Sequence, residues 1–125
     1  MLAVWRHEAV PVNRSRYLVE AIRQGCVQRR YWLRAYAVLP GKLALLLYPL
    51  EDPGGLLAYF DSLTGGAPGR FRLIGADAEL ERAARYVESL PVRSHLAARP
   101  EDYPWSSLGW IGSDQCANVI TPQGP

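Results

Sequence analysis

The chain has 125 residues, of which 49% are hydrophobic, and its formal net charge at pH 7 is +2. This length favours one domain with a single core. The mild charge excludes a polybasic tail, so any nucleic-acid partner would have to be held by a local basic patch. The longest apolar run, 43–50, is far short of a membrane span, and Arg6 and His7 precede any signal-peptide core. We therefore expect a cytoplasmic protein with no membrane partner.

The two cysteines, Cys26 and Cys116, are far apart and match no metal-ligand spacing. They predict neither a zinc site nor a disulfide framework. We expect both to be reduced thiols, as is usual in the cytosol.

The first half of the chain alternates between strand and helix signals. A strand is predicted over 2–12, and a helix capped by Asn13 or Ser15 follows it and ends at Gly25. Two apolar stretches, 31–39 and 42–49, predict strands, because the Pro-Gly pair between them is a turn signal.

The second half continues the alternation. The breaker cluster EDPGG leads into a short helix over 56–63, and 69–75 reads as a strand with one polar face. A longer helix is predicted from Asp77, which we expect to cap it, to Leu90-Pro91, which we expect to stop it.

The resulting order is β-α-β-β-α-β-α. It predicts an α+β, ferredoxin-like fold: a four-stranded antiparallel sheet with helices on one face. We expect a single domain over 1–112 and a carboxy-terminal tail over 113–125, where no periodicity is visible.

Motif spacing indicates no active site. His7 and His95 are too far apart to form a metal site by spacing alone, and the Gly-rich pieces match no phosphate loop. The arginines are more informative, since Arg29, Arg30 and Arg34 flank Tyr31 and Trp32. Such a pattern suits phosphate binding with base stacking, although the pattern taken alone slightly favours a solvated polar face.

One long segment carries a sequence match that is specific to one family. RYVESLPVRSHLAARPEDYPWSSLGWIG (85–112) resembles the run "RYI-LNPVRAGLV--PEDYPWSSYRAYLG" of the REP-associated tyrosine transposases, a branch of the single-tyrosine His-hydrophobic-His (HUH) transposases. AYAVLPGKLALLL (35–47) is similar to the family's "AYVLMPNHVHLLL". GRFR (69–72) is similar to its "GRFK" strand, and AYFD (58–61) to the "RYFN" at the end of its tyrosine helix.

The resemblance implies a metal-dependent chemistry that this chain lacks the ligands for. In the family, two hairpin histidines bind Mg²⁺ or Mn²⁺, and a tyrosine on a facing helix attacks a DNA phosphodiester. Here the histidines are replaced by Lys42 and Ala44, so we expect no metal site and no cofactor. AYFD carries the nucleophile position to Tyr59.

What the resemblance leaves is DNA binding, with hairpin or single-stranded DNA as the implied partner. Arg93 has an alternative role, because it could pair with Glu101 or Asp102 instead. The candidate DNA-binding residues are Arg29, Arg30, Arg34, Lys42, Arg70, Arg72 and Arg93.

Three functions follow from these observations. The first is a degenerate transposase-like protein that binds DNA without cutting it, and is therefore not an enzyme. The second is a protein-interaction or regulatory module on the same fold, acting on a protein partner or as a homodimer. The third is an active DNA transposase with an unusual metal site, which includes His7, and with Tyr59 as nucleophile.

Overall fold

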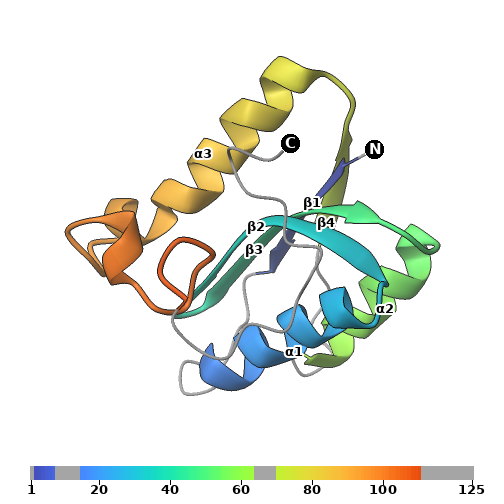
Figure 1. Ribbon diagram of the computed structural model, residues 1–125, viewed down its shortest axis with the longest axis horizontal. Coiled ribbons are helices and arrows are strands. Elements are labelled where there is room, and N and C mark those ends of the chain that lie inside the picture. The colour runs from blue at the N-terminus through green and yellow to red at the C-terminus, as the bar shows by residue number, and fades with distance from the viewer. Residues whose placement is uncertain (1, 8–14, 64–69, 111–125) are drawn as a thin grey trace.

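The computed structural model describes residues 2–7, 15–63 and 70–110, and Figure 1 shows a sheet with helices packed on it. The predicted 113–125 tail lies outside the described residues. The elements in chain order are β1 (Leu2–His7), α1 (Ser15–Val27), β2 (Tyr31–Leu39), β3 (Lys42–Pro49), α2 (Pro53–Leu63), β4 (Arg70–Ile74), α3 (Asp77–Arg93) and a short 3-10 helix, η2 (Pro100–Asp102).

The strands form one antiparallel sheet in the order β2-β3-β1-β4. This is the order that a β-α-β-β-α-β chain takes in ferredoxin-like folds. The α+β class and the antiparallel sheet are therefore confirmed. None of the described helices is long and apolar enough to cross a membrane.

The β2–β3 hairpin has the predicted bounds, and its turn depends on Gly41. This residue adopts a φ of 75°, a left-handed conformation that glycine takes without a steric penalty. Successive side chains along a strand point to opposite faces, so Leu43 and Ala44 lie on opposite sides of the sheet. A register shift between Leu33 and Ala35 marks a bulge in β2 at Arg34.

Four helix boundaries differ from the predictions, and one of them is the start of α2, which begins at Pro53 and not at Leu56. α1 continues through Gly25, where glycine is needed because a Cβ would lie 2.3 Å from the Tyr31 hydroxyl oxygen. α3 continues through Pro91 to Arg93, because a proline in the last turn removes only one helical hydrogen bond. Asp77 is the first residue of α3 and not its cap, which is Ala76.

Two apolar cores lie on opposite faces of the sheet. α1 and α2 cover one face, with Ile22 and Phe60 packed on Leu43 and Leu45. α3 covers the other, with Val87 packed among residues that include Ala44. The prediction that the helices lie on one face is therefore wrong for α3. A helix after the fourth strand is free to cross to the uncovered face, which would otherwise expose its apolar side chains.

The segment after η2 covers the outer edge of β2. The backbone N–H of Val38 donates to the Trp105 carbonyl (2.8 Å), and that of Ser107 donates to the Tyr36 carbonyl (3.0 Å). The buried Tyr103 hydroxyl donates to the Val38 carbonyl at 2.7 Å. These bonds satisfy edge groups that would otherwise be open to another strand.

Cys26 is fully buried in the α1 core and is disulfide-bonded. The expectation of a reduced thiol at this position is therefore wrong. Cys116 lies outside the described residues.

Candidate nucleic-acid interface

The mouth of the β2–β3 hairpin lies under the carboxy-terminal end of α3. A pocket there is lined by Leu39, Pro40, Lys42, Ser94 and Leu96. Lys42 lies two residues before Ala44, so both belong to the sheet face that α3 covers. Lys42 supplies the only charge of this lining.

The residues at this position do not fit a divalent metal. Ala44 has a relative exposure of 1% and offers a methyl group in place of a ligand atom. In the β1–β3 ladder, His7 lies opposite Leu43 and not opposite Ala44. The described part of the chain contains no group of three or more His, Cys, Asp or Glu side chains that could hold a metal ion. The expectation that no cofactor is used remains a prediction.

Tyr59 lies on the wrong face of the sheet for a nucleophile that faces positions 42 and 44. It sits on α2 and packs against the α1 core, where its hydroxyl donates to the Ala21 carbonyl at 3.0 Å. The Arg30 guanidinium stacks 4.2 Å from its ring centroid. Burial raises the pKa of Tyr59, and the Arg30 charge opposes this only in part. Tyr59 is therefore a neutral, hydrogen-bonded phenol on the face opposite positions 42 and 44. This position does not fit the nucleophile role that AYFD implied.

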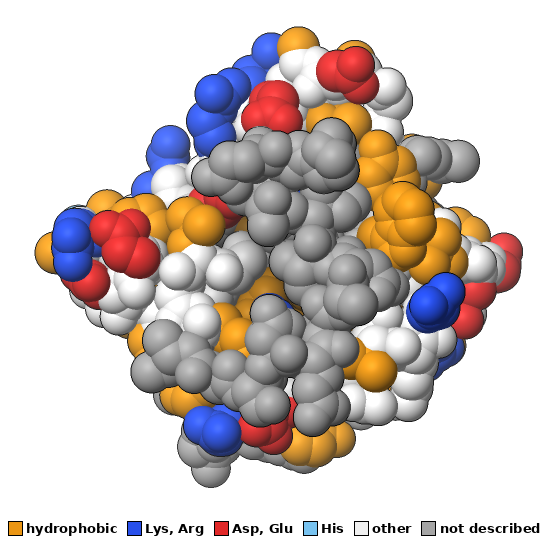
Figure 2. Space-filling model, viewed as in Figure 1, with side chains coloured by type: hydrophobic (Ala, Val, Ile, Leu, Met, Phe, Trp, Pro, Cys, Tyr) orange, Lys and Arg blue, Asp and Glu red, His pale blue; other side chains and the backbone are white. Residues whose placement is uncertain are grey.

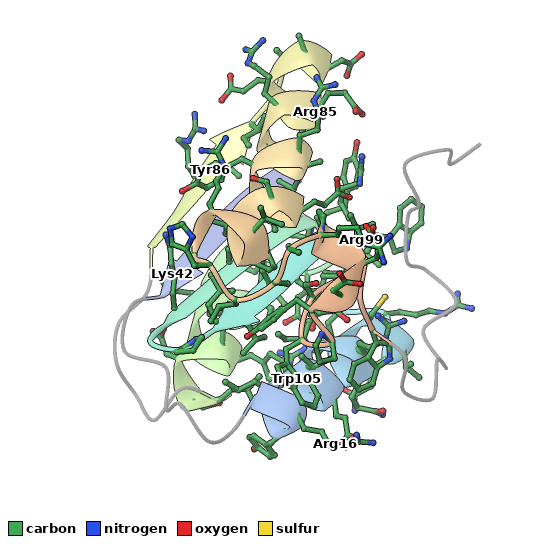
Figure 3. The ribbon with its side chains drawn as sticks, turned by 90° about the vertical axis from the view of Figure 1, so that its left-hand side faces the viewer. Arg16, Lys42, Arg85, Tyr86, Arg99 and Trp105 are labelled. Carbon is green, nitrogen blue, oxygen red and sulfur yellow. The ribbon has the colours of Figure 1, made fainter. Side chains whose placement is uncertain are left out.

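A second tyrosine, Tyr86, which the sequence analysis did not select, lies on the same side of the sheet as positions 42 and 44. It lies on α3, the helix that covers Ala44, and 39% of its surface is exposed. Figure 3 shows Tyr86 and Lys42 on the same side of the molecule. Tyr86 belongs to RYV, at the start of the segment that carries the strongest resemblance, and that was the available signal.

Three of the candidate arginines are held by carboxylates. Arg30 donates to Glu51 at 2.7 Å, and Arg72 pairs with Glu79 at 2.5 Å. Arg34 is the most buried, with 9% of its side chain exposed, and lies 3.7 Å from Glu81 and 3.6 Å from Glu88 on α3. Burial raises the pKa of Glu88, while the Arg34 charge lowers it. Arg34 therefore joins α3 to the bulge of β2, and little of its charge reaches solvent.

The other candidates keep more of their charge available. Arg29 is exposed and Lys42 is partly exposed, and neither forms a salt bridge within the described ranges. Arg93 donates to the Ser89 hydroxyl at 2.8 Å and stacks on Tyr86. The carboxylates at 101 and 102 are instead paired with Arg99, so the alternative partner suggested for Arg93 is wrong. The Arg70 side chain lies outside the described residues.

Fold comparison defines the class to which this arrangement belongs, an α+β domain similar to the transposase fold. A solved structure that the chain resembles is that of a REP-associated tyrosine transposase bound to a REP hairpin. The two share 14% sequence identity with a TM-score of 0.65, over 99% of this chain and 90% of that one. At this identity the similarity shows the fold. No protein-family model and no curated protein matches the chain.

Proposed function

We propose that this chain binds DNA, in hairpin or single-stranded form, and does not cut it. The observation that carries the proposal is the pair of residues at positions 42 and 44 of the hairpin mouth. Lys42 puts a cation beside a pocket, while the neighbouring position where the transposase family has a metal ligand is a buried alanine. A lysine ammonium is a good phosphate contact, but it cannot coordinate a metal.

The fold supports the DNA part of the proposal, because the similar solved transposase is bound to a REP hairpin. The chemistry supports the non-cleaving part. A tyrosine has an ordinary pKa of about 10, so it is a weak nucleophile without a metal or base to activate it. A cytoplasmic location remains a prediction.

The test is a fluorescence-anisotropy titration with a labelled DNA hairpin that carries a single-stranded tail, at several salt concentrations. We expect binding at low salt that weakens steeply as salt rises. Replacing Lys42 with Gln should reduce the slope of log affinity against log salt by about 0.7–0.9, the value for one phosphate contact. Arg16→Gln is the matched control, because Arg16 is an exposed arginine on α1 already paired with Glu20. Absence of binding at low salt would reject the proposal.

A protein-interaction module is the second candidate, and one observation favours it. Trp32 and Leu50, near the open end of the hairpin, have relative exposures of 46% and 47%. Figure 2 shows hydrophobic side chains gathered on the right flank of the molecule. Trp32 packs edge-on against Tyr48 across the ladder, with ring centroids 6.3 Å apart. Sedimentation equilibrium should detect a dimer that Trp32→Ser weakens, if this surface binds a second copy.

A further inference from the structure

Three of the four carboxylates of α3 pair with arginines of the sheet. Glu79 binds Arg72 of β4 on one flank of the helix. Glu81 and Glu88 approach Arg34 of β2 on the other flank. The remaining carboxylate, Asp77, is at the first position of the helix. Pairing with sheet arginines therefore offsets the charge of Glu79, Glu81 and Glu88, of which Glu81 keeps 59% of its side chain exposed.

The outward side of α3 is basic. Arg82, Arg85 and Arg93 are all exposed, and none of them forms a salt bridge among the residues that the structure describes. Positions 82, 86, 89 and 93 recur at helical spacing, so Arg82, Tyr86, Ser89 and Arg93 share one side of the helix. Figure 2 shows a row of Lys and Arg side chains along the upper left, on the outer side of α3.

This row leads to the hairpin mouth. Ser94, the residue after Arg93, lines the same pocket as Lys42. Figure 3 shows Arg85 near the top of the molecule, with Tyr86 and then Lys42 below it. From Arg82 to Arg93 the helix rises about 16 Å, which corresponds to about five base pairs of duplex axis. The basic side chains thus form a track long enough to follow several phosphates.

We infer that the outward side of α3, with Arg82, Arg85 and Arg93, is the surface that binds the sugar-phosphate backbone of DNA. The inference rests on the proposed function and moves the main contact away from the sheet arginines. Arg34 and Arg72 are paired with carboxylates of α3, whereas Arg82 and Arg85 form no salt bridge within the described ranges, although the Arg85 charge acts on Glu88. The Tyr86 ring lies beside this surface, with the Arg93 guanidinium 5.6 Å from its centroid.

The test compares two double variants that each lose two positive charges. Arg82→Gln with Arg85→Gln removes two cations from the track. Arg16→Gln with Arg99→Gln removes two exposed arginines that lie elsewhere on the molecule (Figure 3). The probe is the labelled hairpin with a single-stranded tail. We expect the α3 variant to bind about tenfold more weakly, with a salt slope lower by about 1.4–1.8. The control variant should stay close to the wild type.

Equal affinities and equal salt slopes in the two double variants would overturn the inference while leaving DNA binding intact. Absence of binding by the wild type would instead reject the proposed function, and the inference with it. Arg82→Lys with Arg85→Lys guards against a folding defect, because lysine keeps the charge and contacts phosphate as a point charge. This third variant should bind like the wild type, and a tenfold loss there would contradict an electrostatic role.

Discussion

At the scale of single residues, two side chains occupy a backbone conformation that favours glycine. Arg29 and His95 have φ values of 61° and 59°. Each follows a helix and closes the same pattern of hydrogen bonds, with Arg30 N–H donating to Gly25 and Leu96 N–H to Pro91. This is the Schellman end, in which the left-handed residue is usually glycine. The family run quoted above has glycine where this chain has His95.

We predict that Arg29→Gly stabilises the protein and that Arg29→Ala does not. Glycine relieves the cost of the left-handed conformation, and part of that gain is offset by the greater freedom of its unfolded chain. The free energy of unfolding in urea should rise by about 0.5–1 kcal/mol for glycine relative to alanine. Both variants lose the same charge, so any change in DNA affinity should be equal in the two. Equal stabilities would show that the backbone at this position is not strained.

At the scale of elements, the segment that covers the β2 edge depends on one close approach. A Cβ on Gly109 would lie 1.8 Å from the Tyr103 carbonyl oxygen, a backbone atom that cannot move aside alone. The Tyr103 hydroxyl in turn holds the Val38 carbonyl of β2. Gly109 therefore sets the path of the chain along the sheet edge.

We predict that Gly109→Ala destabilises the protein by about 2–3 kcal/mol, because the turn must open to admit the methyl group. Gly75→Ala is the matched control, since a Cβ at Gly75 meets nothing within 4 Å. The control should be neutral or slightly stabilising. Thermal unfolding followed by circular dichroism measures both. A similar midpoint for the two variants would mean that the edge segment tolerates displacement.

The sequence predicted these elements better than it predicted their arrangement. The bounds of β2 and β3 could be read from their apolar runs and the Pro-Gly turn, because those signals are local. The sheet face that α3 covers could not be read from the sequence. The apolar stripe of α3 shows which side of the helix is buried, but not which face of the sheet it packs against. The resemblance of AYFD points to Tyr59, and only the structure shows that Tyr59 packs on the face opposite Ala44. The missing information on α3 also concealed that Arg34 and Arg72 are paired with this helix.

At the scale of the whole molecule, the sheet separates two environments. Tyr59 and the α1 core are on one face, and Lys42, the pocket and the basic side of α3 are on the other. The proposed DNA contact at the hairpin mouth therefore lies beside the carboxy-terminal end of α3. The two candidate tyrosines can be distinguished by experiment, because only Tyr86 lies on that face.

We predict that no covalent adduct forms when the protein is incubated with hairpin DNA and Mg²⁺ or Mn²⁺. Ala44 supplies no ligand, and Lys42 stabilises phosphate charge without orienting a metal for attack. Denaturing gels with labelled DNA would detect a phosphotyrosine link, and the wild type should give the same blank lane as Tyr59→Phe and Tyr86→Phe. An adduct that disappears only in Tyr86→Phe would overturn the non-cleaving proposal and assign the chemistry to α3. Loss only in Tyr59→Phe would contradict the separation of the two faces, because the buried phenol bonded to Ala21 would have to leave its core to reach DNA.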